Sequence, residues 1–423
     1  MTQSALSKLT ILPTTAALTG RVMPPGSKSI TNRALLVAAL AKGTSRLSGA
    51  LKSDDTRYMA QALRDMGVAI EEPDATSFIV TSDGRLKAPA KPLFLGNAGT
   101  ATRFLTAAAA LVDGTVVVDG DEHMRKRPIL PLVEALTRLG VAINAPSGCP
   151  PVIIQGQGGF EGGLVEVDGG LSSQYVSALL MAGACARNPV DVVLTGQEIG
   201  ARGYVDLTLA TMRAFGAEVS EPASGGWRIA PTGYVATDYL IEPDASAATY
   251  LWAAEVLTGG AIDLGVPASA FTQPDAKAHE LIAAFPNLPA EIDGSQMQDA
   301  VPTLALLAAF NRTPVRFTGI ANLRVKECDR VAALSQGLSR IRPGLGVEEG
   351  DDLLVASDPA LAGQTLAAEI DTFADHRIAM SFALAGLKIG GVTILDPACV
   401  AKTYPDYWRA LGSLGVRFEG EVP

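Results

Sequence analysis

The chain has 423 residues, of which 48% are hydrophobic, and it carries a formal net charge of −10. This acidic balance argues against nucleic acid or an anionic membrane surface as a partner. The four cysteines and three histidines are scattered, so the sequence indicates neither a disulfide framework nor a protein-bound metal. No apolar run approaches the roughly 20 residues of a membrane span, and no signal-peptide pattern opens the chain, so we expect a cytoplasmic protein.

Six Ala- and Leu-rich segments with helical patterning each open on a cluster of polar or charged residues. The unpaired N–H groups at a helix N-terminus attract anions, and Ser, Thr, Lys or Arg placed there complete an anion site. Because Ser, Thr, Asn and Asp are also the preferred N-cap residues, each cluster taken alone also has a purely structural interpretation. The clusters lie at residues 27–33, 96–103, 172–174, 244–246, 298–300 and 375–377.

A second series of six helical segments alternates with the first and with short β-like runs. The alternation predicts stacked α/β units of about 70 residues, repeated six times. Glycines at 67, 140, 216 and 415 stand where a helix commonly ends in the left-handed conformation. The second helices are predicted at residues 56–67, 129–140, 205–216, 275–286, 329–344 and 405–415.

The loops before the second helices are charged as well, most clearly at residues 52–55, 125–127, 324–330 and at Lys402. Two sets of helix N-termini with charged loops could therefore converge on one place. An acidic protein that gathers Lys and Arg at helix starts concentrates positive potential locally, which suits a small anion.

Pro- and Gly-containing breaks at residues 24–26 and 242–244 divide the six units into two groups of three. Two breaks imply two chain crossings between lobes, and residues at element ends are where lobes hinge on ligands. The alternative is that both breaks are ordinary turns.

The motifs, in this order, closely resemble those of the 5-enolpyruvylshikimate-3-phosphate synthases, members of the enolpyruvyl transferase family. The resemblance extends from about Gly20 to about Tyr407. It is carried by Pro-Gly-Ser-Lys-Ser at 25–29 with Asn32 and Arg33, Leu-Gly-Asn-Ala-Gly-Thr at 95–100 with Arg103, Ser-Ser-Gln at 172–174, Arg-Val-Lys-Glu at 324–327 with Asp329 and Arg330, Asp-His-Arg at 375–377, and Ala-Lys-Thr at 401–403 with Pro-Asp-Tyr at 405–407.

The resemblance implies an α/β fold of two similar lobes, each of three βαββαβ units with buried helices, an inside-out α/β barrel joined by a two-stranded hinge. We expect one discontinuous lobe from residues 1–23 and 241–423, a second from residues 24–240, and the active site in the cleft between them. It further implies transfer of the enolpyruvyl group of phosphoenolpyruvate to the 5-hydroxyl of shikimate 3-phosphate, with release of phosphate. No cofactor is implied. We expect a monomer, with glyphosate as a competitive inhibitor.

Site residues are carried over motif by motif. Those implied for shikimate 3-phosphate are Lys28, Ser29, Arg33, Ser172, Ser173, Gln174, Tyr204, Asp299, Asn322 and Lys326. Those implied for phosphoenolpyruvate are Lys28, Gly99, Arg127, Gln174, Arg330, Arg377 and Lys402. The implied catalytic residues are Asp299 as base, Glu327 as acid and Lys28. Planar Arg forks suit carboxylate and phosphate, and Lys supplies a point charge, so the mixture is chemically sensible.

Several of these residues also have plainer interpretations. Asp299 could be the N-cap of a helix over residues 300–310. Glu327 could form a surface ion pair of small energetic value with its basic neighbours. His376 could orient its loop, the Asp54–Asp55 pair could start a helix that positions Lys28, and Cys328 and Cys399 are interpreted as packing residues.

The chain departs from the family pattern at three positions. Ala201 stands where a serine often contacts the shikimate phosphate, and Gln298 where a proline commonly precedes the base. Phe104 replaces a proline near the start of the helix that Gly99 opens, so we expect a differently set first turn and weaker inhibition by glyphosate.

Two other functions compete. The sister enzyme, UDP-N-acetylglucosamine enolpyruvyl transferase, shares the fold, but usually has Asn where Ser29 stands and a reactive cysteine on a mobile loop. No cysteine lies near residues 122–127. A non-catalytic binder of phosphorylated metabolites is the other alternative. It would gain nothing from carboxylates such as Asp299 and Glu327 among bound anions.

Overall fold

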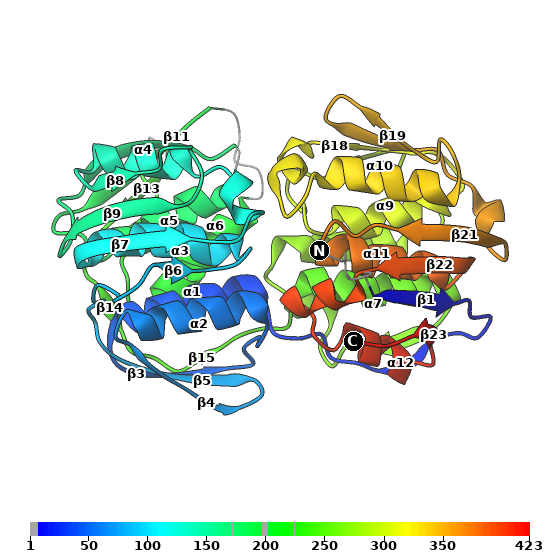
Figure 1. Ribbon diagram of the computed structural model, residues 1–423, viewed down its shortest axis with the longest axis horizontal. Helices are drawn as coiled ribbons and strands as arrows, with labels where there is room; N and C mark the ends of the chain where they lie inside the picture. The colour runs from blue at the N-terminus through cyan, green and yellow to red at the C-terminus, as the bar shows by residue number, and fades with distance from the viewer. Residues whose placement is uncertain (1–6, 171, 197–201, 224) are drawn as a thin grey trace, which may run out of the picture. The chain divides into compact units, whose positions relative to one another are not determined.

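The computed structural model describes residues 7–170, 172–196, 202–223 and 225–423, and the chain divides into two compact units (Figure 1). One unit is continuous, Gly26–Glu242, and the other joins Met1–Pro25 to Pro243–Pro423. These limits lie two residues from the predicted lobe boundaries. Ala201 lies outside the described residues.

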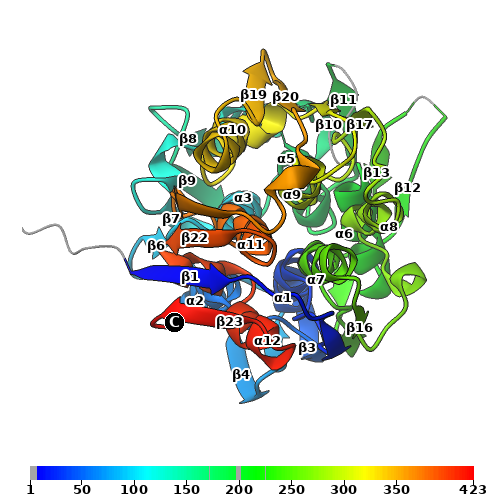
Figure 2. The ribbon, with the colours of Figure 1, turned by 90° about the vertical axis from the view of Figure 1, so that its right-hand side faces the viewer.

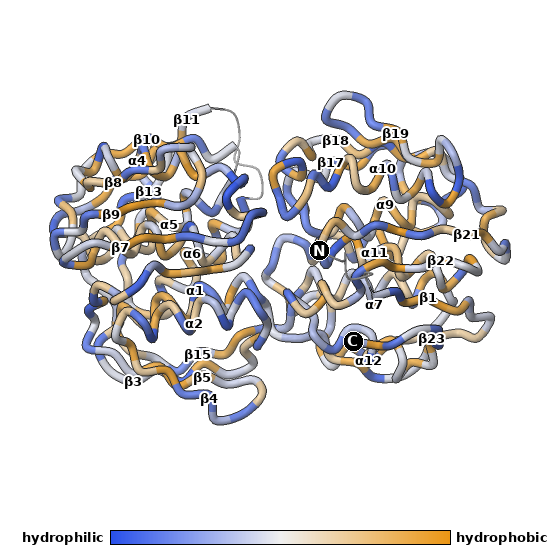
Figure 3. Tube along the Cα trace, viewed as in Figure 1, coloured by the Kyte–Doolittle hydropathy of each residue, from blue (hydrophilic) through white to orange (hydrophobic). Residues whose placement is uncertain are grey.

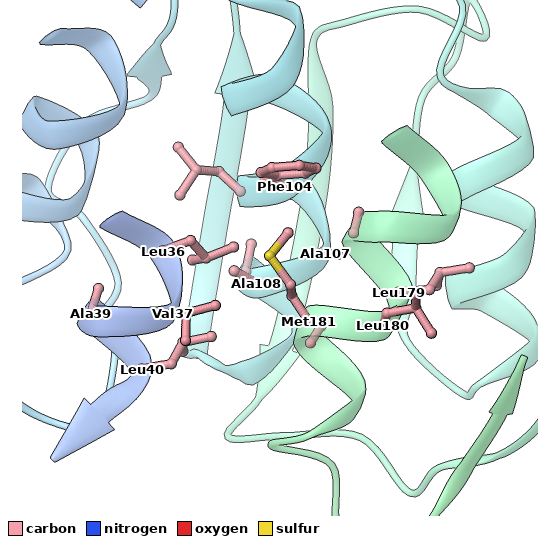
Figure 4. Packing of buried hydrophobic residues seen from close by; sticks show 14 of the residues in the cluster. Leu36, Val37, Ala39, Leu40, Phe104, Ala107, Ala108, Leu179, Leu180 and Met181 are labelled. Carbon is pink, nitrogen blue, oxygen red and sulfur yellow. The ribbon is translucent and has the colours of Figure 1, made fainter. Parts of the chain in front are cut away.

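The continuous unit is built around three helices that are buried on almost every side. These are α1 (Lys28–Leu40), α3 (Gly99–Ala108) and α5 (Ser173–Gly183). Their apolar residues surround the helix axis, which is the pattern of a helix with no solvent face. Figure 4 shows them meeting through Leu36 and Val37 of α1, Phe104 of α3 and Met181 of α5.

Three amphipathic helices and three sheets complete this unit. The helices are α2 (Asp54–Asp65), α4 (Leu130–Arg138) and α6 (Gly203–Ala214). The sheets comprise β14 (Tyr234–Val235), β15 (Tyr239–Leu240), β3 (Ala41–Ser48), β5 (Ser77–Asp83) and β4 (Ala69–Asp74); β6 (Leu93–Phe94), β7 (Asp113–Asp119), β9 (Val152–Gln157) and β8 (Ala142–Asn144); and β10 (Gly163–Asp168), β11 (Val190–Thr195), β13 (Trp227–Ile229) and β12 (Val219–Ser220).

The discontinuous unit repeats this plan. Its buried helices are α7 (Ala245–Thr258), α9 (Val301–Ala309) and α11 (His376–Gly386), and its remaining α-helices are α8 (Ala278–Ala283), α10 (Arg330–Ile341) and α12 (Tyr407–Ser413). Its sheets comprise β17 (Glu291–Asp293), β18 (Val315–Thr318), β20 (Asp352–Val355) and β19 (Gly346–Glu349); β21 (Thr365–Ile370), β22 (Gly390–Leu395), β1 (Lys8–Leu12) and β23 (Arg417–Gly420); and β2 (Thr19–Arg21) with β16 (Ala261–Asp263).

Strand β1 lies between strands from the far end of the sequence. It pairs antiparallel with β22 on one side and with β23 on the other, as Figure 2 shows. Strand β2 likewise pairs with β16, in parallel. The N-terminal segment therefore completes two sheets of a unit whose other strands follow residue 260.

The predicted fold class is confirmed, with one difference in the order of elements. A parallel strand pair joined by a buried helix is followed by a second helix and a hairpin, as in β6-α3-β7-α4-β8-β9. We expected βαββαβ, but the observed order is βαβαββ. All six second helices are present near the predicted positions, and the four glycines predicted to end them have φ between 82° and 98°.

Each unit has its own hydrophobic core. The buried apolar residues form two clusters, one from residues 30–241 and one from residues 9–18 and 245–416. Figure 3 shows hydrophobic colour on the buried helices and a mixture of hydrophobic and polar colour along the strands. Burial alternates along strands such as β10 and β18, the period-2 pattern of strands with one face on a core.

The chain crosses between the units twice, and the two crossings are hydrogen-bonded. The N–H of Ser27 donates to the carbonyl of Glu242 at 2.9 Å, and the N–H of Asp244 donates to the carbonyl of Pro25 at 2.8 Å. A Cβ on Gly26 would lie 1.9 Å from the carbonyl oxygen of Gly49. Only glycine allows so close a backbone approach, which makes this crossing more than an ordinary turn.

Within the described part of the chain, no helix is both long and apolar enough to cross a membrane.

Candidate active site

The N-terminus of α1 holds the first predicted cation. Ser27 caps the helix by accepting the N–H of Ile30 at 3.4 Å, so the structural interpretation of this cluster also holds. Lys28 is the first helical residue, and its Nζ lies 3.6 Å from Oδ2 of Asp55, which is almost fully buried near the start of α2. The acidic pair therefore starts a helix, and Asp55 of the pair contacts Lys28, while Ser29 is half-buried beside Lys28.

Arg33, predicted to bind shikimate 3-phosphate, is buried among neutral partners. Its Nε donates to Oγ1 of Thr208 at 2.7 Å, and its terminal nitrogens donate to the carbonyls of Ser29 (2.8 Å) and Tyr204 (2.9 Å). Its guanidinium lies over the ring of Phe104, 5.2 Å from the centroid. Burial lowers the pKa of Arg33 to about 10, although the coulombic effects of two tyrosines oppose the shift.

The N-termini of α3 and α5 lie close together. Gln174 of α5 donates from Nε2 to Oγ1 of Thr100 at 3.3 Å, and Ser172 caps α5 by accepting the N–H of Gln174. Gly99 opens α3 directly against Arg127: a Cβ on Gly99 would lie 2.8 Å from Nη2 of that arginine. Any larger residue at this position would displace the Arg127 side chain.

Phe104 is the sixth residue of α3 and is fully buried. A proline here would crowd the carbonyl four residues earlier, that of Thr100, which lies in the first turn that Gly99 begins. That the phenylalanine sets this turn differently therefore stays a prediction. A proline at this position would remove an interior helical hydrogen bond, whereas the phenylalanine contributes a ring to Arg33.

In the discontinuous unit, Asp299 is held by two arginines. Its Oδ1 lies 2.9 Å from Nη1 of Arg330, and its Oδ2 lies 2.7 Å from Nη2 of Arg377. The plainer interpretation of Asp299 is wrong, because α9 begins at Val301 with Ala300 as its N-cap. The N–H of Ala300 instead donates to the buried side chain of Asp275.

Glu327 is not a surface ion pair. Its side chain is 7% exposed, with Oε2 at 2.7 Å from Nη2 of Arg330 and Oε1 at 2.9 Å from Nζ of Lys402. Arg330 also pairs with Asp375 at 2.7 Å, so its guanidinium contacts three carboxylates. Burial alone would lower the pKa of Arg330, but the three carboxylates outweigh it and raise the pKa above its usual value.

The remaining predicted residues lie around this cluster. Lys326 donates from Nζ to Oε1 of Gln298 at 3.2 Å, so the residue that replaces the family proline is in contact with a predicted ligand. Arg377 donates to the hydroxyl of Tyr250 at 3.4 Å, and burial raises the pKa of that tyrosine to about 12. Oδ1 of Asn322 is buried without a hydrogen-bond partner in the described residues.

Asp375 lies in the Asp-His-Arg motif, but its role is not evident from the sequence. It is fully buried, caps α11 and binds Arg330. Burial raises the pKa of Cys328 and of Cys399, consistent with packing roles for both thiols. The described residues contain no group of His, Cys, Asp and Glu that could hold a metal ion.

The arrangement defines a class of protein. Cations stand at the N-termini of buried helices in both units, and in one unit two carboxylates, Asp299 and Glu327, lie among them. Such a set can bind anionic groups and exchange protons without a metal. This is the layout of a group-transfer enzyme for phosphorylated, carboxylated substrates.

Comparison with known proteins makes the assignment specific. A sequence model described as EPSP synthase (3-phosphoshikimate 1-carboxyvinyltransferase) matches residues 12–411. The 3-phosphoshikimate 1-carboxyvinyltransferase of Rhizobium etli is 73% identical over 418 residues, 99% of each chain, and that of Pseudomonas syringae pv. syringae is 72% identical over 408 residues, 96% of this chain and 98% of the relative. The EPSP synthase structure from Acinetobacter baumannii aligns with a TM-score of 0.79 at 27% identity, covering 98% of this chain and all of that one.

The chain belongs to the EPSP synthase family. It is a transferase that moves the enolpyruvyl group of phosphoenolpyruvate to the 5-hydroxyl of shikimate 3-phosphate and releases phosphate, in the shikimate pathway to chorismate and the aromatic amino acids. The alternative acceptor, a UDP-linked amino sugar, is not favoured.

Proposed function

We propose that Asp299 and Glu327 exchange the protons of the reaction while the cations at the helix starts hold the two anionic substrates. One observation carries this proposal: both carboxylates are ion-paired with cations of the set Arg330, Arg377 and Lys402. A protein that only bound anions would be weakened by carboxylates at these positions. An enzyme that transfers protons, in contrast, needs carboxylates of this kind as its acid and base.

Shikimate 3-phosphate is bound, in this proposal, by hydroxyls and cations from both units. Ser29, Ser172 and Ser173 lie at the starts of α1 and α5, where N–H groups and the helix dipole favour a phosphate. The other proposed ligands are Lys28, Arg33, Gln174, Tyr204, Asp299, Asn322 and Lys326. Arg33 contributes mainly by fixing Ser29 and Tyr204, because four of its donated hydrogen bonds go to protein groups.

Phosphoenolpyruvate is clamped, in this proposal, by Lys28, Gly99, Arg127, Gln174, Arg330, Arg377 and Lys402. The absence of a side chain at Gly99 lets Arg127 lie against the start of α3. The two arginines that hold Asp299 have planar forks that match a carboxylate or a phosphate bidentately. The same positions would bind glyphosate, which we propose as a competitive inhibitor.

The proton transfers follow from the ion pairs. Asp299 accepts the proton of the 5-hydroxyl as that oxygen attacks the phosphate-bearing carbon C2 of phosphoenolpyruvate, and Glu327 donates a proton to the methylene carbon. An anionic substrate beside Glu327 favours its protonated form. Loss of phosphate from the tetrahedral intermediate, with return of the methyl proton, completes the transfer. Lys28 neutralises charge on the departing phosphate.

The proposed ligands of each substrate are divided between the units, so we propose that neither unit binds them productively alone. If one molecule of substrate engages both, saturation with ligand should compact the protein. Small-angle scattering with an unchanged radius of gyration would count against this division.

Two further points are proposals as well. We propose a monomer, because each predicted ligand is supplied within one chain. We propose a cytoplasmic location, because the four cysteines, all within the described residues, are free thiols, as is usual in a reducing compartment.

The test of the function is release of phosphate from phosphoenolpyruvate with each acceptor. We expect turnover with shikimate 3-phosphate and none with UDP-N-acetylglucosamine at equal concentration. Glu348→Gln is a matched control for Glu327→Gln, because Glu348 pairs with an arginine in the same unit but at an exposed position. Phosphate release that required the UDP-sugar, or a Glu327→Gln variant as active as Glu348→Gln, would overturn the proposal.

A further inference from the structure

Asp375 is a fully buried carboxylate that accepts hydrogen bonds from Arg330 on both oxygens, at 2.7 Å on Oδ2 and 3.4 Å on Oδ1. Oδ1 accepts the N–H of Arg377 at 2.8 Å, which caps α11. Oδ2 accepts Nε of Arg330 at 2.7 Å and lies 3.7 Å from Sγ of Cys328. One side chain thus joins the start of α11, the start of α10 and the loop that carries Lys326 and Glu327.

The contact with Arg330 determines where the rest of that guanidinium points. Nε is held by Asp375, and the two terminal nitrogens meet Asp299 at 2.9 Å and Glu327 at 2.7 Å. A guanidinium is planar and rigid, so fixing its Nε edge fixes the directions of both terminal nitrogens. The orientation of Asp299 and Glu327 therefore depends on Asp375, although none of the hydrogen bonds given above joins Asp375 to either carboxylate.

We propose that Asp375 is a positioning residue for enolpyruvyl transfer: it holds Arg330 and Arg377 in the orientation that binds phosphoenolpyruvate and aligns the two proton-exchanging carboxylates. The inference rests on the proposed role of these arginines. Asp375 acts through them and is not itself a catalytic residue.

Helix capping alone does not account for an aspartate here. A cap needs one acceptor, and serine or asparagine supplies it about as well. Oδ2 is directed at Arg330 instead, and a charge this deeply buried is tolerated only when it is paired. Asparagine has one oxygen for two donors, so it must turn its NH₂ toward either Arg330 or the N–H of Arg377.

The discriminating variant is Asp375→Ser, which retains a capping oxygen for α11 and removes the partner of Arg330. The matched control is Asp329→Ser. Asp329 caps α10 by accepting the N–H of Ala332 at 3.0 Å, immediately before Arg330, and its carboxylate pairs with Arg324 at 2.9 Å. Both substitutions make the same chemical change at a helix N-cap of the same unit.

We expect Asp375→Ser to raise the KM for phosphoenolpyruvate and lower kcat, each about tenfold or more, because a hydrogen bond to a charged group is lost. The KM for shikimate 3-phosphate should stay within about twofold, the usual scatter for uncoupled sites. Asp329→Ser should leave all three constants within the same range. If the substitution only impaired folding, the fraction of active enzyme and hence the apparent kcat would fall, but neither KM would change.

Kinetic constants of Asp375→Ser equal to those of Asp329→Ser, in a wild-type enzyme that turns over, would overturn the positioning role while leaving the proposed function intact. If Asp375→Ser does not fold, Asp375→Asn gives the same comparison. Arg330→Lys supplies an independent measurement. In the Arg330→Lys background, adding Asp375→Asn should change the KM for phosphoenolpyruvate by less than about twofold. If Asp375→Asn raised this KM as much in that background as it does alone, Asp375 would not act through Arg330.

Discussion

Arg33 in the continuous unit and Arg330 in the discontinuous unit are both deeply buried, but the groups that surround their guanidinium ions differ. Arg33 is surrounded by hydroxyls, backbone carbonyls and an aromatic ring, and its pKa is lowered to about 10 by burial. Arg330 meets three carboxylates, and they raise its pKa despite burial. The two units therefore share one fold plan but differ in the charges around their buried arginines.

The difference teaches how one topology supports two tasks. A buried cation with neutral partners keeps its positive charge uncompensated, which favours anions at the neighbouring helix starts. When three carboxylates surround a buried cation, the cation holds them in fixed positions instead. Two of these carboxylates are the ones proposed to exchange protons. In the proposed mechanism both proton-exchanging carboxylates lie in the discontinuous unit, whereas the proposed ligands of the substrates come from both units.

The largest expected effect concerns the carboxylates that distinguish Arg330. Asp299→Asn and Glu327→Gln should each lower turnover by about 10²-fold or more while both substrates still bind, because general acid–base groups typically contribute 10² to 10⁴. Steady-state phosphate release and equilibrium binding measure the two parts separately. Near-normal turnover in both variants would remove the functional contrast between the units.

Substituting the two arginines themselves tests the contrast through stability. Arg330→Met leaves three carboxylates, two of them buried, without their shared cation, and we expect it to cost about 3–5 kcal/mol of unfolding free energy. Arg33→Met leaves only neutral acceptors behind, so its cost should be about 1–3 kcal/mol. Denaturant unfolding of both variants measures the difference, and equal costs would contradict the comparison.

Alkaline pH should affect the two regions in opposite directions. Tyr250, beside Arg377, has a pKa raised from 10.0 to about 12 by burial, so its contribution to stability is present below pH 10 and is lost as pH rises toward 12. Arg33 has a pKa lowered from its ordinary value to about 10, so above pH 10 the unfolded chain binds more protons and stability rises with pH.

The two contributions can be separated by comparing unfolding free energies at pH 9 and pH 11. Tyr250→Phe should lose less stability over this interval than the wild type, by about 1 kcal/mol, and Arg33→Met should lose more. Identical pH dependence in both variants and the wild type would show that neither group contributes.

The smallest effect expected is at the ring beneath Arg33. A cation–π contact is worth about 0.5–2 kcal/mol, so a double-mutant cycle of Phe104→Leu and Arg33→Met should give a coupling energy in that range. A coupling indistinguishable from zero would reduce Phe104 to a packing residue.

Periodicity was sufficient to predict the repeating helices, because burial on all sides in α3 and on one face in α2 leaves different sequence patterns. It did not give the order βαβαββ, since short strands such as β6 have only two residues and leave almost no pattern. The start of α3 at Gly99 was predicted correctly, but the contact of Phe104 with Arg33 was not, because it joins two helices that are far apart in the sequence.

The candidate site was predicted as a set of residue types but not as a network. Asp299 was recognised through its motif, yet nothing in the sequence near residue 299 indicates that Arg330 and Arg377 are its partners. Those contacts span 31 and 78 residues and depend on packing of α9, α10 and α11. The contacts of Asp275 and Asp375 were missed for the same reason. In a sequence, an aspartate that caps a helix cannot be distinguished from one that also binds residues far along the chain.

The middle position of β1 has a consequence for biosynthesis. Gly26–Glu242 is complete once its own residues have left the ribosome, so this unit can fold during translation. Strand β1 is made earliest but pairs with β22 and β23, whose residues follow it by about 380 and about 410 positions. At roughly 5–20 residues per second, it must wait on the order of 20–80 seconds for its partners. An emerging hydrophobic strand with unpaired edges is then the natural client of a chaperone, and slower codons near the 3′ end would prolong its exposure.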